Sequence, residues 1–460
     1  MKNYIIYSIN NTIGSFSMSS HTSEKTRQLY IKAKNIIPGG TQLLSKRPEM
    51  FAPDTWPAYY SKAKGCEIWD IDGNHYFDMS ICGIGACLFG YNDSDVTNAV
   101  KDAIDKGSMC TLNPPEEVEL AEKLCEIHPW ARNARFARCG GEAMSVAVRI
   151  ARATTGKSKV AVCGYHGWHD WYLAANLGKD DSLKGLLLPG LQPAGVPVEL
   201  RNTALAFNGG NIDEFRKIIR EHDGELAAVV MEPCRNYFYD PEFISEIRET
   251  TAKNKIVLIF DEITIGWRLF YGGAHLKMGI NPDMAVFAKA LGNGHPISAV
   301  IGTTEAMSGA HSSFISSTYW TERTGPAAAL AVLKKMEKID IPSHIEKIGR
   351  SVKSLWSEYG KKYSVPVAVD DSFPALAHFS FEHEKANILK TLFIQEMLEE
   401  GFLAGLAFYP TMAHGQEIID KYSKALDTVF GKLASMMKTG SIEKFLRGAA
   451  AHQGFKRLAS

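Results

Sequence analysis

Short apolar runs alternate with helical patterns through the middle of this chain, from about residue 96 to residue 315. Such short apolar runs fit strands that are buried on both faces, and the segments between them repeat their apolar positions at helical spacing. This alternation is typical of a mainly parallel sheet between two layers of helices. The strands predicted in this way are residues 160–162, 227–231, 256–260 and 284–287.

The two ends of the chain carry different patterns. A helical pattern over residues 23–35 stops at Pro38-Gly39-Gly40, and an Asp-Gly turn between alternating residues predicts a hairpin over 66–78. Near the other end, residues 374–381 are a predicted strand and 387–400 a predicted helix. We therefore expect the α/β class, with a large domain around the mainly parallel sheet and a smaller αβ domain formed by both chain ends.

The expected organisation has four parts. Residues 1–20 lack a sustained apolar core, so we expect a disordered extension rather than a signal peptide, with Met18 as an alternative start of translation. A long helix is predicted to begin near residue 327. The parts are the extension at 1–20, an N-terminal segment of the small domain at 21–95, the large domain at 96–326, and the long helix with the C-terminal small domain at 327–460.

Composition and charge narrow the classes of partner. Of 460 residues, 45% are apolar and 22% charged, which is ordinary for a globular protein, and the formal net charge is zero. This balance argues against nucleic acid or an acidic membrane surface as a partner. No apolar run reaches the roughly 18–20 residues of a membrane helix. Among eight cysteines there is no Cys-x-x-Cys pair and no zinc spacing, so we expect free thiols, no metal and a cytoplasmic location.

The strongest chemical signal is a lysine that follows a predicted strand. Lys289 lies in a glycine-rich turn after residues 284–287, and Asp261 follows the preceding predicted strand, 289 − 261 = 28 residues upstream. This pair suits pyridoxal phosphate, because the lysine amine forms a Schiff base with the aldehyde and the carboxylate keeps the pyridine nitrogen protonated. Each residue alone has a simpler explanation, Lys289 as a surface lysine and Asp261 as the partner of Arg268.

Other strand ends carry candidate ligands. Cys139-Gly140-Gly141 precedes an alanine-rich helical segment, where backbone N–H groups can bind an anion, although such a turn is usually only a turn. Tyr165 could stack on a flat ring, although the simpler interpretation is that its side chain packs against its own domain. His166 and His169 are three residues apart, but no carboxylate pattern supports a metal there. Glu232 follows another strand, and an isolated Glu-Pro is more often a solvated turn.

Together, these positions gather at the carboxyl ends of strands, which is where α/β sheets bind ligands. In this order they resemble a class III, fold-type I pyridoxal-phosphate-dependent aminotransferase, nearest the glutamate-1-semialdehyde 2,1-aminomutase branch. The resemblance covers residues 23–433. It is carried by Ile37-Pro38-Gly39-Gly40, Trp69-Asp70-Ile71-Asp72-Gly73, Gly141-Glu142-Ala143, Tyr165-His166-Gly167, Glu232-Pro233, Phe260-Asp261-Glu262-Ile263, Gly266-Trp267-Arg268 and Lys289.

The resemblance implies a role for each residue of the site. Lys289 would hold the cofactor aldehyde and move a proton, and Asp261 would bind the pyridine nitrogen. Family members close the phosphate site with a threonine of the neighbouring subunit, which matches Thr318 and implies a homodimer with shared active sites. The other implied contacts are Cys139, Gly140 and Gly141 at the phosphate, Tyr165 and Ile263 on the ring faces, Asn236 near the ring oxygen, and His166 and Glu232 also at the cofactor.

The chain departs from the family in four places. The turn after Lys289 usually carries three glycines, and here Asn293 replaces the middle one and His295 follows. Cys139-Gly140-Gly141 lacks both hydroxyl groups of the usual Ser-Gly-Thr or Ser-Gly-Ser turn. The aminomutases use an arginine after Pro-Gly-Gly for the substrate carboxylate, and here Lys46 or Arg47 would take that part. The loop at 406–414 has no acidic residue where the aminomutases carry one. We therefore expect a different substrate pocket beside a largely kept cofactor site.

From these observations we predict an aminotransferase that moves an amino group from an amino donor to a carbonyl acceptor through a Schiff base on Lys289. The alternative is glutamate-1-semialdehyde 2,1-aminomutase, an isomerase that transfers the amino group within one substrate. A third alternative is a non-enzymatic relative with the same fold, and the intact Lys289 and Asp261 argue against it. The expected partners are small-molecule donors and acceptors, with neither nucleic acid nor membrane.

Overall fold

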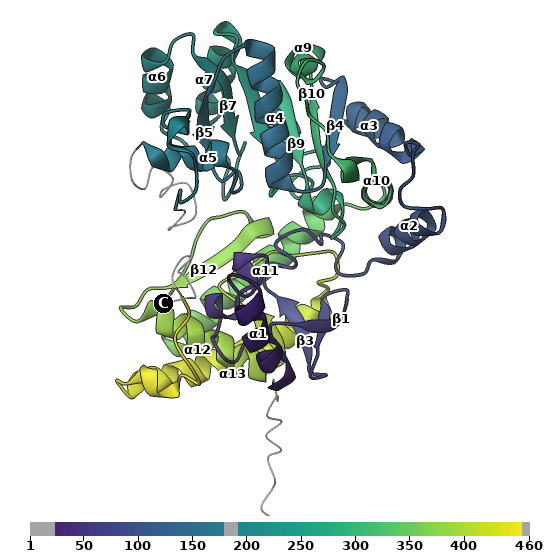
Figure 1. Cartoon of the computed structure of the whole chain (residues 1–460). Helices are drawn as coiled ribbons and strands as arrows, with labels where there is room; N and C mark the ends of the chain where they lie inside the picture. Colours follow the sequence, from purple (N-terminus) through teal and green to yellow (C-terminus); the bar gives the residue numbers. More distant parts are fainter. Residues whose placement is uncertain (1–23, 179–191, 453–460) are drawn as a thin grey trace, which may run out of the picture.

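The structure, a computed structural model, describes residues 24–178 and 192–452. The extension expected at residues 1–20 lies outside the described residues. Figure 1 shows two halves, with a large sheet and its helices in the upper half and smaller sheets with long helices in the lower half. Within the described ranges, no helix is long and apolar enough to cross a membrane.

Seven strands form the sheet of the upper half, in the order β4-β10-β9-β8-β7-β5-β6. Strand β10 runs antiparallel to both neighbours, whereas the other neighbours pair in parallel, so the predicted mainly parallel sheet is confirmed. The strands are β4 (Asn133–Ala137), β5 (Lys159–Cys163), β6 (Ala204–Ala206), β7 (Leu226–Met231), β8 (Val257–Asp261), β9 (Met284–Phe287) and β10 (Ser298–Gly302).

Both faces of this sheet are buried. Along β7, Ala228 and Val230 pack with α4 on one face, and Val229 and Met231 pack with α6 and α7 on the other. Burial on both faces explains why the strands are continuous apolar runs. The helices are α4 (Gly140–Thr155), α5 (Asp170–Leu173) and α9 (Thr304–Met307) on the first face, and α2 (Ser94–Asp105), α3 (Pro115–Ile127), α6 (Ile212–Glu221), α7 (Pro241–Lys253) and α10 (Thr324–Met336) on the second.

The lower half is built from both ends of the chain, as Figure 1 shows by colour. Its two sheets have the orders β1-β2-β3-β13 and β11-β12-β14, and β3 and β13, far apart in sequence, pair in parallel. Its elements are α1 (Glu24–Ile36), β1 (Tyr60–Lys64), β2 (Glu67–Asp70), β3 (His75–Met79), α11 (Ile341–Tyr363), β11 (Val367–Val369), β12 (Ala377–Phe381), α12 (Ala386–Glu399), β13 (Phe402–Ala404), β14 (Ala407–Phe408) and α13 (Gln416–Lys438).

Two predicted elements differ from the structure. The strand predicted at 374–381 begins with a 3-10 helix, Pro374–Leu376, and only Ala377–Phe381 form β12. Proline has no N–H group for sheet pairing, so the strand begins after it. The long helix predicted near residue 327 is two helices, α10 and α11, and Asp340 caps the second of them through a hydrogen bond from the N–H group of Ser343.

Candidate active site

Lys289 follows β9 and begins a short 3-10 turn, Lys289–Leu291. Its φ of +47° is a left-handed conformation that is uncommon outside glycine and that clusters at functional sites. Its amine donates a hydrogen bond to Oγ1 of Thr264 at 2.8 Å. Burial, followed by the nearby Arg235 guanidinium, lowers the pKa of the amine to about 8. A substantial fraction of neutral, nucleophilic amine is therefore present near pH 8.

Asp261 ends β8, the strand beside β9, and its carboxylate is held on two sides. Oδ1 accepts the backbone N–H of Ile263 at 3.0 Å, and Oδ2 lies 2.8 Å from Nδ1 of His166. His166 is itself buried, and its Nε2 lies 3.2 Å from the carbonyl oxygen of Cys163. The carboxylate is thus oriented and largely shielded from water, which strengthens its interaction with any cation in the adjacent cavity.

The predicted phosphate turn lies at the start of α4, a helix of 16 residues. Glu142 closes this turn, because its Oε2 accepts the N–H groups of Arg138 at 2.8 Å and of Cys139 at 3.4 Å. The first N–H groups of a helix have no partner within the helix and favour an anion. The turn therefore offers backbone donors in place of the hydroxyl groups that this sequence lacks.

Close contacts explain both glycines of the turn. A Cβ atom on Gly140 would lie 2.9 Å from Cδ1 of Ile263, and one on Gly141 would lie 3.1 Å from Nδ1 and Cε1 of His169. Nδ1 of His169 is shielded from water and has no hydrogen-bond partner among the residues that the structure describes. Side chains of neighbouring loops thus fill the space that a larger residue at either position would need.

Many of the predicted cofactor-binding residues line a cavity of about 440 Å³. Glu232 supports it from behind: its Oε2 accepts the N–H of Tyr165 at 3.2 Å, and its Oε1 accepts a hydrogen bond from Arg235 at 2.6 Å. The lining includes Cys139, Gly140, Gly141, Tyr165, His166, Asp261, Ile263, Thr264 and Lys289.

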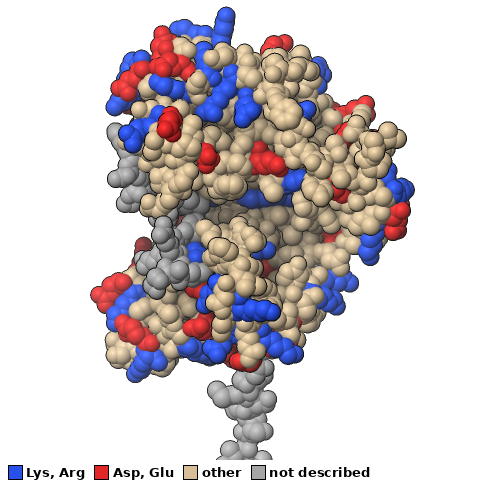
Figure 2. All heavy atoms as spheres, viewed as in Figure 1, with Lys and Arg blue, Asp and Glu red and all other residues tan. Residues whose placement is uncertain are grey.

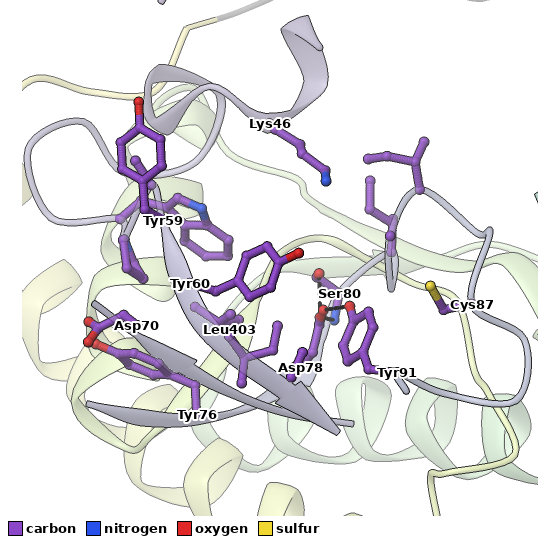
Figure 3. Close-up of a pocket in the computed structure, with 18 of the residues that line it drawn as sticks. Lys46, Tyr59, Tyr60, Asp70, Tyr76, Asp78, Ser80, Cys87, Tyr91 and Leu403 are labelled. Carbon is purple, nitrogen blue, oxygen red and sulfur yellow. Dashed lines mark hydrogen bonds between the residues drawn. The ribbon is translucent and has the colours of Figure 1, made fainter. Parts of the chain in front are cut away.

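A second cavity of about 360 Å³ adjoins the first, since Ala86 and Gly294 line both. Figure 2 shows that the molecule is hollowed between its two halves. In Figure 3 the amine of Lys46 points into the second cavity, across from Asp78. Asp78 already accepts hydrogen bonds from Ser80 and Tyr91. Lys46, by contrast, has no ion-pair partner among residues 24–178 and 192–452, so its charge is available to a ligand.

Not every predicted site residue lines a cavity. Arg47 is buried and is not part of the lining that includes Lys46. Asn236 lies after β7, where its carbonyl oxygen accepts the N–H of Phe373. Thr318 is exposed at the start of a 3-10 turn, Thr318–Thr321, and does not line the cofactor cavity, although Trp320 of the same turn donates a hydrogen bond to Glu142.

Sequence reasoning missed two residues beside the lysine. Thr264 carries no signal, since a lone threonine in a loop is unremarkable until the fold brings Lys289 to it. Arg235 had one available signal, its spacing of three residues from Glu232, with which it pairs.

Comparison with known proteins agrees with this geometry. Residues 51–428 match the family model of class III aminotransferases. This chain belongs to that family. It is 30% identical over 376 residues to 3-aminobutyryl-CoA aminotransferase of Cloacimonas acidaminovorans (strain Evry), covering 80% of this chain and 86% of that protein. It is 31% identical over 438 residues to glutamate-1-semialdehyde 2,1-aminomutase of Methanosarcina acetivorans, covering 89% and 99%.

A solved structure shows the same fold. The PLP internal aldimine form of the FumI protein of Sphingopyxis sp. MTA144 superposes with a TM-score of 0.80 at 22% identity, covering 93% of this chain and 98% of that one. The fold is thus fold type I. Pyridoxal phosphate is the cofactor of this class III enzyme, whose reaction is that of a transaminase or an aminomutase. The cavity fits this cofactor, with a lysine and a buried carboxylate on adjacent strands and a glycine turn at a helix start.

Proposed function

We propose that this enzyme is an aminotransferase that moves an amino group from an amino donor to a carbonyl acceptor, with Lys289 as the covalent anchor of the cofactor. The observation that carries the proposal is the position of the Lys289 amine in the cavity, one strand away from the Asp261 carboxylate. Pyridoxal phosphate, when bound, supplies an electron-accepting ring that stabilises negative charge on the substrate carbon.

Each residue of the cavity has a matching task. Asp261, oriented by His166, would hold the proton on the pyridine nitrogen. The N–H groups at the start of α4 would bind the phosphate. Tyr165 and Ile263, which both line the cavity, would confine the ring. Nζ of Lys289 would take the proton from the amino-bearing carbon and return it, as a general acid–base must.

Lys46 is the proposed contact for an anionic group of the substrate. Its amine points into the cavity that adjoins the cofactor cavity, and the buried carboxylate across from it is already occupied by Ser80 and Tyr91. Asp70, the other carboxylate in the lining, accepts hydrogen bonds from the N–H groups of Asp72 and Asn74. The cavity thus offers a cation beside carboxylates that already have partners, which favours a substrate with a carboxylate or another anion. Of the two tentative residues, Lys46 is therefore preferred over the buried Arg47.

A homodimer with shared sites is part of the proposal. Thr318 lies on the surface among large exposed apolar side chains, with Phe314 exposed at 89% and Tyr319 at 65%. Apolar groups of this size on a surface favour a protein partner. A second copy that covered them would bring Thr318 to the phosphate turn of that copy, as the family resemblance implies.

The aminomutase is the runner-up, and the similarity to it over 89% of this chain gives it weight. The test mixes the holoenzyme with single amino donors and follows the cofactor absorbance until the amino group has been transferred; a carbonyl acceptor should then restore the original spectrum. Offered alone, glutamate-1-semialdehyde should yield little 5-aminolevulinate. Efficient conversion without any donor would establish the aminomutase instead.

A further inference from the structure

The turn that follows β8 is fixed at both ends. The N–H of Gly266 donates to the carbonyl oxygen of Glu262 at 2.8 Å, and a Cβ atom on Gly266 would lie 2.5 Å from that oxygen. The Glu262 carboxylate accepts the N–H groups of Ala274 at 3.0 Å and His275 at 2.9 Å, at the start of α8 (Ala274–Met278). Thr264, in the middle of this turn, therefore presents its hydroxyl group at a fixed place.

Lys289 reaches the same place from the neighbouring strand. Strands β8 and β9 pair in parallel, with Asp261 opposite Val286, so the residues after both strands meet at one edge of the sheet. Thr264 and Lys289 both line the cofactor cavity, and Nζ lies 2.8 Å from Oγ1. Within the described parts of the chain, Nζ has no second hydrogen bond.

This contact has a chemical consequence for the amine. A primary amine rotates about its last carbon–carbon bond among three staggered positions. When it donates an N–H to Oγ1 of Thr264, one position is selected, and the lone pair of the neutral amine stays free for a reacting carbon. Catalytic side chains gain rate when a supporting residue holds them in this way.

We propose that Thr264 is a positioning residue that holds Nζ of Lys289 whenever this amine is not bonded to the cofactor. The proposal deepens the proposed function, on which it rests, because it names the residue that aims the catalytic amine. Asp261, Glu232, Arg235 and Arg268 also act on the lysine, but through their charges.

The test uses three forms of the full-length enzyme: wild type, Thr264→Val, which keeps the shape without the hydroxyl, and Thr264→Ser, which keeps the hydroxyl. Each is stripped of cofactor and mixed with pyridoxal phosphate, so that the Lys289 amine condenses with the aldehyde and releases water. The rate, followed by absorbance from about pH 6 to pH 10, should rise with the neutral fraction of the amine and then level off.

We expect the plateau rate of Thr264→Val to fall roughly tenfold, the effect of one lost hydrogen bond, while Thr264→Ser stays within about twofold. The midpoint pH of Thr264→Val should move below that of the wild type, because an acceptor favours the charged amine. In turnover, kcat should fall with KM unchanged. A variant that merely loosened the fold would instead move the midpoint toward that of a solvated lysine.

The results distinguish a failure of the proposed function from a failure of the proposed role of Thr264. If the wild type forms no adduct on Lys289, the proposed function fails. If the wild type reacts and Thr264→Val matches it in plateau rate, midpoint and kcat, only the role of Thr264 is refuted. Thr264→Ala, which needs no packing of a second methyl group, serves the same comparison should the valine variant not fold.

Discussion

At the scale of single residues, the proposed chemistry depends on the amine of Lys289. Reduction of the holoenzyme with borohydride, followed by peptide mapping, should place a pyridoxyl group on Lys289 and on no other lysine. Lys289→Ala should abolish this adduct, whereas the control Lys277→Ala, on α8, should keep it. An adduct on another lysine would refute the assignment.

The pKa of Lys289 sets a pH dependence with a defined sign. Burial and Arg235 lower this pKa to about 8, while Asp261 and Glu232 raise it. Reloading of the stripped enzyme should therefore lose roughly tenfold in rate per pH unit below about 8 and become flat above it. Arg235→Gln removes a cation near Lys289 and leaves the Glu232 carboxylate without its partner, so the midpoint of the pH dependence should move to higher pH. Arg235→Lys, which keeps the positive charge, is the control. A midpoint that moved down in Arg235→Gln would contradict this account.

Asp261→Asn tests the proposed role of Asp261 as the partner of the pyridine nitrogen. A neutral amide cannot stabilise a protonated ring as a carboxylate does, so we expect turnover to fall at least about a hundredfold. The fold should be kept, because the amide of the variant can still meet His166 and the N–H of Ile263. Stopped-flow absorbance with a good donor measures the effect on the transfer step, and thermal unfolding is the control. Near-normal turnover would rule out the role of Asp261.

The residues that the sequence could predict are those with a local signal. Asp261 ends one buried apolar strand, Lys289 follows the next, and Gly140 and Gly141 begin a helix, so a local pattern in the sequence marks each position. Thr264 and His169 depend on contacts between loops, with Lys289 and with Gly141 respectively. No pattern within one loop encodes such a contact, because it arises only when neighbouring strands align.

At the scale of elements, the start of α4 and the loop before α5 fit against each other. A Cβ atom at Gly141 would lie 3.1 Å from the ring of His169, and a Cβ atom at Gly167 would lie 3.1 Å from Cα of Gly141. The hydroxyl residue that the family usually carries at this turn would therefore require the ring of His169 to shift by a few tenths of an ångström. A change in one loop is thus expected to affect the other.

This fit predicts a coupled pair of substitutions. Gly141→Thr alone should weaken binding of pyridoxal phosphate, by roughly tenfold, because overpacking would displace the turn that we propose to bind the phosphate. His169→Ala together with Gly141→Thr should recover most of that loss, and His169→Ala alone is the control. Equilibrium titration of the stripped enzyme measures the affinity. Tighter binding of pyridoxal phosphate by Gly141→Thr alone would contradict this prediction, because it would show that the ring of His169 moves aside without weakening the site.

The helices and strands that the sequence could predict are likewise those with a local pattern. The central strands were found because burial on both faces makes them apolar without interruption, as in β7 and β9. The small sheets were harder: β1 is largely exposed and β14 has two residues, so neither has an apolar run to detect. The parallel pairing of β3 with β13 joins residues more than 300 positions apart, and no local pattern encodes it.

At the scale of the whole molecule, the proposed dimer makes a prediction that only shared sites can meet. Thr318→Ala should weaken cofactor binding by roughly tenfold, the effect of one hydrogen bond to a charged group. Thr321→Ala, in the same turn, is the matched control. If Thr318 contacts the cofactor of the neighbouring copy, the weakened cofactor binding occurs in the site of the other subunit, not in the site of the altered chain.

Mixed dimers separate a shared site from a site within one chain. A Lys289→Ala chain keeps Thr318, and a Thr318→Ala chain keeps Lys289. A dimer of one of each then has one site with both residues, because the first chain lends its threonine to the lysine of the second. At limiting pyridoxal phosphate, borohydride labelling of the mixture should rise well above that of Thr318→Ala alone, and the label should lie on the Thr318→Ala chain. If Thr318 instead acts within its own chain, no pairing restores a complete site, and mixing should leave the labelling unchanged.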